Sequence, residues 1–214
     1  MHLHRNPRWK SLASLETEEV LGSKDYVDLN DLSRLKVVSN CLKEALRLTP
    51  PAPFTFKQTV NDFVIPHDQD QVTDSLHAHD EERGVPFMPP SPFIEPCSNR
   101  QAGKTIPAGC RIGITIFAMH RHPLLWSNGD KFLPDRWAAK AKETTTPLAF
   151  IPFSIGSRNC IGQVFSQMEA KIILARFLRA FDFDLVHDGE HDQYIESLTL
   201  HFRHGLKVKL RNRN

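Results

Sequence analysis

Phe153-Ser-Ile-Gly156-Ser-Arg158-Asn-Cys160-Ile-Gly162 is the stretch of this sequence that decides the fold. It runs directly into a segment with helical periodicity, so Cys160 is expected just before a helix. The unpaired N–H groups and the positive dipole end of a helix N-terminus favour a thiolate over a thiol. Gly156 and Gly162 permit unusual backbone angles and the close approach of a flat macrocycle. These are the properties that a thiolate ligand of a haem iron requires.

The same ten residues resemble the signature Phe-x-x-Gly-x-Arg-x-Cys-x-Gly of the cytochrome P450 superfamily, and they match it at every fixed position. The competing interpretation is a buried structural cysteine in a glycine turn, but so many fixed residues at set spacing rarely arise by chance. The resemblance implies haem b as cofactor and Cys160 as metal ligand. It further implies that Phe153 packs beside the sulfur. Arg158 lies two residues before the sulfur and could bind a haem propionate.

Two upstream motifs also resemble this superfamily. Glu44-Ala-Leu-Arg47 matches its Glu-x-x-Arg element, and the (i, i+3) spacing places both side chains on one helix face. Pro134-Asp-Arg136-Trp137 is similar to its Pro-Glu-Arg-Phe element, with Asp for Glu and Trp for Phe. The resemblance implies that Arg136 completes a structural triad with Glu44 and Arg47, because a planar guanidinium that bridges a carboxylate fixes geometry.

Further segments resemble family four of the superfamily, whose members hydroxylate fatty acids near the chain end: residues 103–109, 120–123 and 158–163. The resemblance implies a haem-dependent monooxygenase that acts on fatty-acid or other lipid-like substrates. It implies an NADPH-cytochrome reductase as partner, at the cytosolic face of the endoplasmic reticulum membrane. A basic patch around Arg158 and Lys171 is the expected docking surface. One departure concerns a second propionate ligand, where the family has arginine and this chain offers Lys57, with Arg100 as the rival.

The resemblance covers less than half of a full family member. No segment matches the membrane anchor, the N-terminal half of the fold or the distal helix with its acid/threonine pair. Two alternatives therefore stand beside the monooxygenase: a catalytically inactive truncated fragment, or a peroxide-using relative that needs neither reductase nor that pair. For the isolated chain, inactivity is the expectation, since a haem without its distal wall would face water.

Composition agrees with a globular domain. The 214 residues are 40% hydrophobic and 24% charged, and the net charge of +2 gives no reason to expect nucleic acid as a partner. No apolar stretch reaches the length that crosses a bilayer. Four cysteines without Cys-x-x-Cys spacing indicate neither a disulfide scaffold nor a zinc site, and they suit a reducing, cytosol-facing environment.

Periodicity predicts a mostly helical α+β domain over residues 1–214, the C-terminal part of the cytochrome P450 fold with small β-sheets. A first helix is expected over 7–21, from Pro7 to a stop at Gly22. A second helix is expected from an N-cap at Asp31 to Leu48, ahead of Pro50. A strand is expected over 111–118, and terminal strands over 181–186 and 197–210. The helix after Cys160 is expected to bury one stripe: Ile161, Phe165, Met168, Ile172, Ala175 and Leu178.

Residues 66–102 are predicted to form an exposed insertion. They are rich in Asp, Glu and His, and near-copies of one proline cluster, at 50–54 and 89–93, bracket them. His77 and His79 are interpreted as part of a solvated loop, because no further ligand follows at metal-binding spacing. A retained intron or a gene-model error is the hypothesis for residues 66–95, which transcript sequencing would test.

Overall fold

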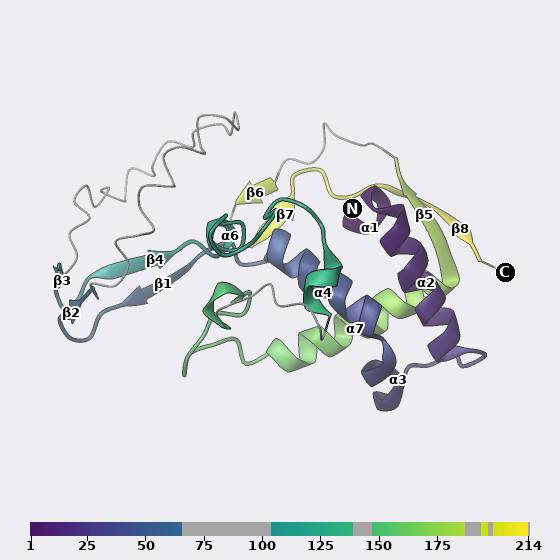
Figure 1. The fold of residues 1–214 in the computed structure, drawn as a ribbon, viewed down its shortest axis with the longest axis horizontal. Helices are drawn as coiled ribbons and strands as arrows, with labels where there is room; N and C mark the ends of the chain where they lie inside the picture. The colour runs from purple at the N-terminus through teal and green to yellow at the C-terminus, as the bar shows by residue number, and fades with distance from the viewer. Residues whose placement is uncertain (66–103, 139–146, 187–193, 197–198, 214) are drawn as a thin grey trace. The chain divides into compact units, whose positions relative to one another are not determined.

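The computed structural model describes residues 1–65, 104–138, 147–186, 194–196 and 199–213. The chain forms two compact units: unit 1 contains Met1–Thr55 and Thr115–Asn214, and unit 2 contains Phe56–Ile114. Helices dominate unit 1, and the strands form small two-stranded sheets (Figure 1). This mixture confirms the predicted α+β class. Within the described ranges, no helix combines the length and the apolar character that a bilayer crossing needs.

Helix α2 spans Pro7–Leu21, as the sequence predicts. Proline at the first helical position loses no intrahelical hydrogen bond, and Gly22 ends the helix with a positive φ of 52°. Its buried face carries Trp9 and Ala13. Leu15, on the same helix, is 61% exposed. A four-residue helix that the sequence did not predict, α1 (His2–Arg5), precedes α2.

The predicted N-cap at Asp31 is wrong. The residue that caps helix α3 (Leu29–Arg34) is Asp28, and Asp31 is the partner in its capping box. The Asp28 carboxylate accepts the Asp31 N–H at 2.9 Å, and the Asp31 carboxylate accepts the Asp28 N–H at 3.1 Å. The expected single helix is therefore split, and α4 spans Lys36–Leu48.

A residue of another helix caps α4. Glu16, on α2, accepts hydrogen bonds from the N–H groups of Lys36 at 2.7 Å, Val37 at 2.7 Å and Val38 at 2.9 Å. These groups are among the donors that a helix N-terminus leaves without an intrahelical partner. The carboxylate also carries negative charge at the positive end of the helix dipole. Glu16 thus fixes the start of α4 against α2.

Helix α7 spans Gln163–Ala180 and packs against α2 and α4 (Figure 1). Its C-terminal half enters the hydrophobic core, where Ala175 and Leu178 are fully buried and Ile172 packs against the cluster. The predicted stripe is wrong at its other end, because Ile161 and Phe165 are exposed. The core of unit 1 thus lies under the second half of α7, while the first half presents apolar side chains to solvent.

The remaining elements of unit 1 are short: α6 (Ile116–Met119) and the 3-10 helices η2 (Pro134–Trp137) and η3 (Pro147–Ala149). Strand β5 (Phe181–Leu185) pairs antiparallel with β8 (Val208–Asn212), and β6 (Tyr194–Glu196) pairs with β7 (Leu200–Phe202). The expected strand over 181–186 is confirmed. The second region of expected terminal strands, 197–210, contains β7 and the start of β8, which continues to Asn212.

Unit 2 contains two small sheets. Strand β1 (Thr55–Gln58) pairs with β4 (Arg111–Ile114), and β2 (Phe63–Val64) pairs antiparallel with β3 (Thr105–Ile106). The strand predicted to continue to 118 ends at Ile114, because the following residues turn into α6, which buries Ile116. The whole of the predicted insertion, residues 66–102 with His77, His79 and Arg100, lies outside the described residues.

Candidate functional site

The loop from Ile151 to Gly162 carries Cys160 to the start of α7. Its main chain is closed by hydrogen bonds from the N–H of Ser154 to the Ile151 carbonyl at 2.9 Å and from the N–H of Cys160 to the Phe153 carbonyl at 2.9 Å. Two residues adopt left-handed backbone angles, Ser154 with φ 62° and Gly156 with φ 89°. Only glycine adopts the second conformation without strain. The loop is therefore a closed, defined turn that ends at the cysteine.

Cys160 is exposed, so its sulfur is accessible to a ligand. In the described part of the chain, the N–H groups of Ile161 and Gly162 donate to no backbone carbonyl, and they lie at the positive end of the α7 dipole. A Cβ added at Gly162 would lie 3.7 Å from the Cys160 Sγ, so a side chain there would contact the sulfur. The surroundings therefore leave Cys160 open to a ligand.

The surface around Cys160 is apolar. Ile161 is fully exposed, and Ile155, Val164 and Phe165 are also exposed. Exposed apolar side chains this close in the sequence to one thiol present an area that water solvates poorly. Among the described residues there is no cluster of three or more His, Cys, Asp or Glu side chains that could hold a metal ion. A single thiolate on an apolar surface suits iron inside an apolar macrocycle, so these residues fit the predicted haem.

The other residues predicted to hold haem are placed differently. Phe153 is half-buried and Arg158 is exposed, both on the loop that ends at Cys160. Lys57 lies on β1 in unit 2 and is half-buried. Contacts of Arg158 and Lys57 with haem propionates stay predictions.

Glu44 is a fully buried carboxylate at the centre of the second motif. Arg47 binds it with two hydrogen bonds, Nη2 to Oε1 at 2.8 Å and Nε to Oε2 at 3.0 Å, and Arg136 Nε lies 3.0 Å from Oε1. The N–H of Leu133 donates to Oε1 and Trp137 Nε1 donates to Oε2, both at 2.9 Å. Burial opposes the ionisation of Glu44, yet the hydrogen bonds and charge of Arg47 leave its pKa below the ordinary value. The carboxylate is therefore ionised and fully hydrogen-bonded.

Arg47 connects α4 to the segments that precede the loop. Its Nη1 donates to the carbonyls of His120 at 2.6 Å and Gly129 at 2.5 Å, and its Nη2 donates to the Lys131 carbonyl at 3.0 Å. With the two bonds to Glu44, every N–H of this guanidinium is used. The Arg47 and Arg136 guanidinium carbons lie 5.1 Å and 5.6 Å from the ring centroid of Trp126. These contacts fix α4, η2 and the intervening chain relative to one another.

His120 is a buried site residue that motif analysis missed. Its Nδ1 lies 3.2 Å from the Arg47 carbonyl, its Nε2 accepts the Ile151 N–H at 3.0 Å, and its ring stacks on Phe150 at 5.3 Å. Burial is the main reason why its pKa falls to about 4. The sequence contains His120 within the family-four resemblance over 120–123, but nothing in that pattern indicates a contact with residue 151.

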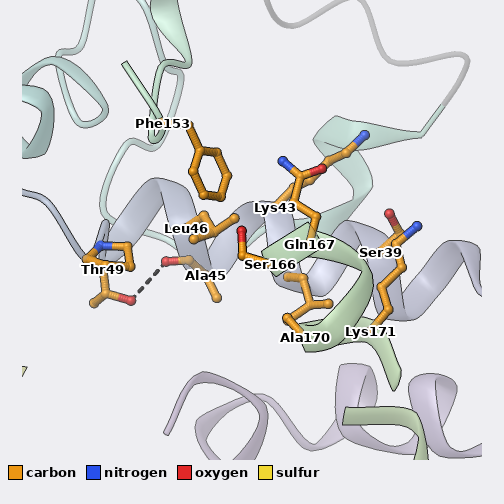
Figure 2. Close-up of a pocket in the computed structure, with 12 residues that line it drawn as sticks. Ser39, Lys43, Ala45, Leu46, Thr49, Phe153, Ser166, Gln167, Ala170 and Lys171 are labelled. Carbon is orange, nitrogen blue, oxygen red and sulfur yellow. Dashed lines mark hydrogen bonds between the residues drawn. The ribbon is translucent and has the colours of Figure 1, made fainter. Parts of the chain in front are cut away.

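A pocket of about 300 Å³ lies between α4 and α7 (Figure 2). Figure 2 shows Phe153 and Leu46 at one end and the ammonium-bearing side chains of Lys43 and Lys171 at the other. Burial, together with the nearby positive charges of Lys43 and Lys36, lowers the pKa of Lys171. The pocket thus has an apolar end beside the cysteine loop and a cationic end.

The family model described as cytochrome P450 matches residues 1–70 and 96–209. The chain is 32% identical to human "Cytochrome P450 4F12" over 85% of its length and 32% identical to "Cytochrome P450 4d8" of Drosophila melanogaster over 99%. It spans only 28% and 38% of those two relatives.

A solved structure, the "Crystal structure of cytochrome P450DA heme domain", superimposes with a TM-score of 0.76 at 27% identity. The match covers 99% of this chain and 39% of that chain. The predicted fold, part of a haem domain, is therefore confirmed.

Proposed function

Since this chain belongs to the cytochrome P450 family, we propose that it forms the haem-anchoring part of a haem-thiolate monooxygenase, with Cys160 as the iron ligand. The observation that carries the proposal is the exposed Cys160 thiol, which lies at the end of a closed loop and immediately before α7. Exposed apolar residues flank it in the sequence, which suits an apolar planar cofactor. The bound haem would supply the activation of dioxygen, which a thiolate ligand such as Cys160 would favour.

Each site residue has a distinct role in this proposal. Cys160 binds the iron, and Phe153 packs beside the sulfur. Gly156 and Gly162 let the loop turn and leave room for the macrocycle. Arg158 binds a haem propionate by a charge-assisted hydrogen bond.

Lys57 is proposed for the second propionate, where it makes one point-charge contact instead of the bidentate fork of an arginine. Glu44, Arg47 and Arg136 act as scaffold, since their ion pairs are buried and each bond fixes a neighbouring segment.

The substrate class and the electron donor proposed for this chain are those of family four, which it resembles. The identity to "Cytochrome P450 4F12" and "Cytochrome P450 4d8" supports a substrate that is a fatty acid or another lipid-like molecule. An NADPH-cytochrome reductase is the proposed electron donor, and Lys171 with Arg158 offers positive charge for its docking. The cytosolic face of the endoplasmic reticulum membrane is the proposed location of the protein.

The decisive experiment expresses the chain with haem, reduces it, adds carbon monoxide and records the Soret band. We expect a red-shifted thiolate-type band that disappears in Cys160→Ser and persists in Cys110→Ser, a matched change at a partly buried cysteine of unit 2. A free-haem spectrum in the wild-type protein would contradict the proposal and support the inactive fragment. Where the band appears, product formed with peroxide alone, and not with reductase and NADPH, identifies a peroxide-using relative.

A further inference from the structure

His120 has a single tautomer in this structure. The Ile151 N–H can only donate, so the Nε2 that faces it at 3.0 Å must carry a lone pair. The proton therefore resides on Nδ1, which donates to the Arg47 carbonyl. The ring is fully buried and neutral, and each nitrogen holds a different segment: Nδ1 holds the C-terminal end of α4, and Nε2 holds the residue that begins the cysteine loop.

A short series of hydrogen bonds leads from His120 to the sulfur-bearing residue. Nε2 fixes the N–H of Ile151, the carbonyl of Ile151 accepts the N–H of Ser154, and the preceding carbonyl, that of Phe153, accepts the N–H of Cys160. Ile151 is buried, so water does not readily replace Nε2 as its partner. The position of the loop thus depends on one imidazole nitrogen.

We propose that His120 is the positioning residue for Cys160: as a neutral imidazole, it holds the cysteine loop against α4 and so sets where the thiolate meets the haem iron. This inference rests on the proposed function only where it is tested by the spectrum of bound haem. A merely structural histidine would stabilise the fold equally through either nitrogen. A positioning residue would act on the loop through Nε2 alone.

Two amide variants separate the two nitrogens. The amide of asparagine occupies the place of Nδ1, so His120→Asn keeps a donor for the Arg47 carbonyl and loses the acceptor for Ile151. The amide of glutamine reaches the place of Nε2, so His120→Gln keeps an acceptor for Ile151. We expect the Ile151 and Cys160 amides to exchange with solvent roughly tenfold faster in His120→Asn than in His120→Gln, as the loss of a buried hydrogen bond requires.

The spectrum of bound haem should distinguish the two His120 variants in the same way. In the reduced carbon monoxide complex, His120→Gln should keep the thiolate-type band, while His120→Asn should shift toward a thiol- or free-haem-type spectrum. His2→Gln is the matched control, because His2 is a partly buried histidine whose ring stacks on Phe132 and whose Nε2 lies 3.4 Å from the Thr49 hydroxyl, outside the cysteine loop. This variant should change overall stability without changing exchange at Ile151.

These experiments distinguish a failure of the positioning role from a failure of the proposed function. Equal exchange at Ile151 in both His120 variants, at equal unfolding free energy, overturns the positioning role. A wild-type chain without a thiolate-type band overturns the proposed function, and the exchange experiment still decides the role of His120. Should neither variant fold, nitrogen NMR of the wild-type imidazole decides: a proton on Nδ1 supports the inference, and a proton on Nε2 overturns it.

Discussion

Arg47 and His120 each bind the main chain of the other residue: the guanidinium donates to the His120 carbonyl at 2.6 Å, and the imidazole Nδ1 lies 3.2 Å from the Arg47 carbonyl. Both side chains are fully buried. The Glu44 carboxylate holds Arg47 from the other side, at 2.8 Å and 3.0 Å. The buried charge of the family's Glu-x-x-Arg motif is thereby linked through His120 to the loop that carries Cys160.

Glu44→Gln is expected to lower the free energy of unfolding by about 3–5 kcal/mol, because it removes the carboxylate charge that pairs with the fully buried Arg47 and with Arg136. Urea denaturation measures the change. Glu18→Gln is the matched control, since Glu18 pairs with Arg213 at 3.0 Å on the surface, and its loss should cost at most about 1 kcal/mol. Equal losses in the two variants would contradict the central role of the buried carboxylate.

Trp137→Phe should cost about 1.5–3 kcal/mol, because the variant loses the hydrogen bond from Nε1 to the ionised Glu44 at 2.9 Å. Much of the aromatic packing on Phe150, 4.5 Å away, is retained. Trp126→Phe is the control: Trp126 is almost fully buried, but its Nε1 has no hydrogen-bond partner among the described residues. Thermal unfolding should therefore show the smaller loss for Trp126→Phe, and the reverse order would exclude the Trp137 bond as a stabilising contact.

Stability should fall as pH decreases from 6.5 to 4. Burial lowers the pKa of His120 and of His2 from 6.5 to about 4. The unfolded chain therefore binds protons in this range before the folded chain does, and the stabilisation, which is complete above pH 6.5, is lost as pH approaches 4. For His120 the loss amounts to about 3 kcal/mol. Carboxylates whose pKa is lowered, such as Glu44, add to this loss of stability only below their ordinary pKa of 4.5.

Urea denaturation at a series of pH values measures this dependence. The slope between pH 6.5 and 4 should become shallower in His2→Gln, because one of the two histidines no longer titrates. A free energy of unfolding that stays constant over this range would show that both histidines titrate normally in the folded chain.

Sequence motifs located those parts of the candidate site in which the chemistry fixes both the residue type and the spacing. The cysteine loop, the start of a helix after it and the residues of the triad can all be located from local motifs. The triad contact between Arg136 and Glu44 was implied by the family resemblance, but the other contacts that join distant segments could not be predicted, because neither periodicity nor spacing encodes them. The capping of α4 by Glu16 and the bond from Ile151 to His120 are two examples.

The misassigned apolar positions have a different cause. Periodicity placed Ile161 and Phe165 on the same helical stripe as Ala175 and Leu178, but Ile161 precedes α7 and Phe165 is exposed. The core of unit 1 reaches only the second half of α7, whereas the first half lies beside the exposed cysteine. A helical pattern shows that a face is apolar, but it does not show what covers that face.

Gly156→Ala should destabilise the cysteine loop by roughly 1–2 kcal/mol, because the native φ of 89° is unfavourable for a residue with a Cβ. No atom lies within 4 Å of the added Cβ, so the cost arises from the backbone alone. Amide exchange at Asn159, whose N–H donates to the Gly156 carbonyl, measures local opening. Gly156→Asn is the control and should exchange more slowly than Gly156→Ala, since asparagine tolerates left-handed angles. Identical exchange in both variants would refute the requirement for a positive φ.

Deletion of residues 71–95, which lie outside the match to the family model, should leave the fold intact. The chain on either side is held together by β2 and β3, where Val64 pairs with Thr105, and by a hydrogen bond from the Ile65 N–H to the Lys104 carbonyl at 3.1 Å. Because a shorter loop costs less entropy to close, the deletion should raise the free energy of unfolding by up to about 1 kcal/mol.

Urea denaturation and the carbon monoxide spectrum of the shortened chain test this deletion. A glycine/serine linker of equal length in place of 71–95 is the control: it preserves the loop length, so its stability should equal that of the wild-type chain. Loss of more than about 2 kcal/mol in both variants would mean that side chains of 71–95 pack on the fold, because loop closure alone cannot produce a loss of that size. The segment would then be part of the folded domain, and the hypothesis of a retained intron or gene-model error would fail with it.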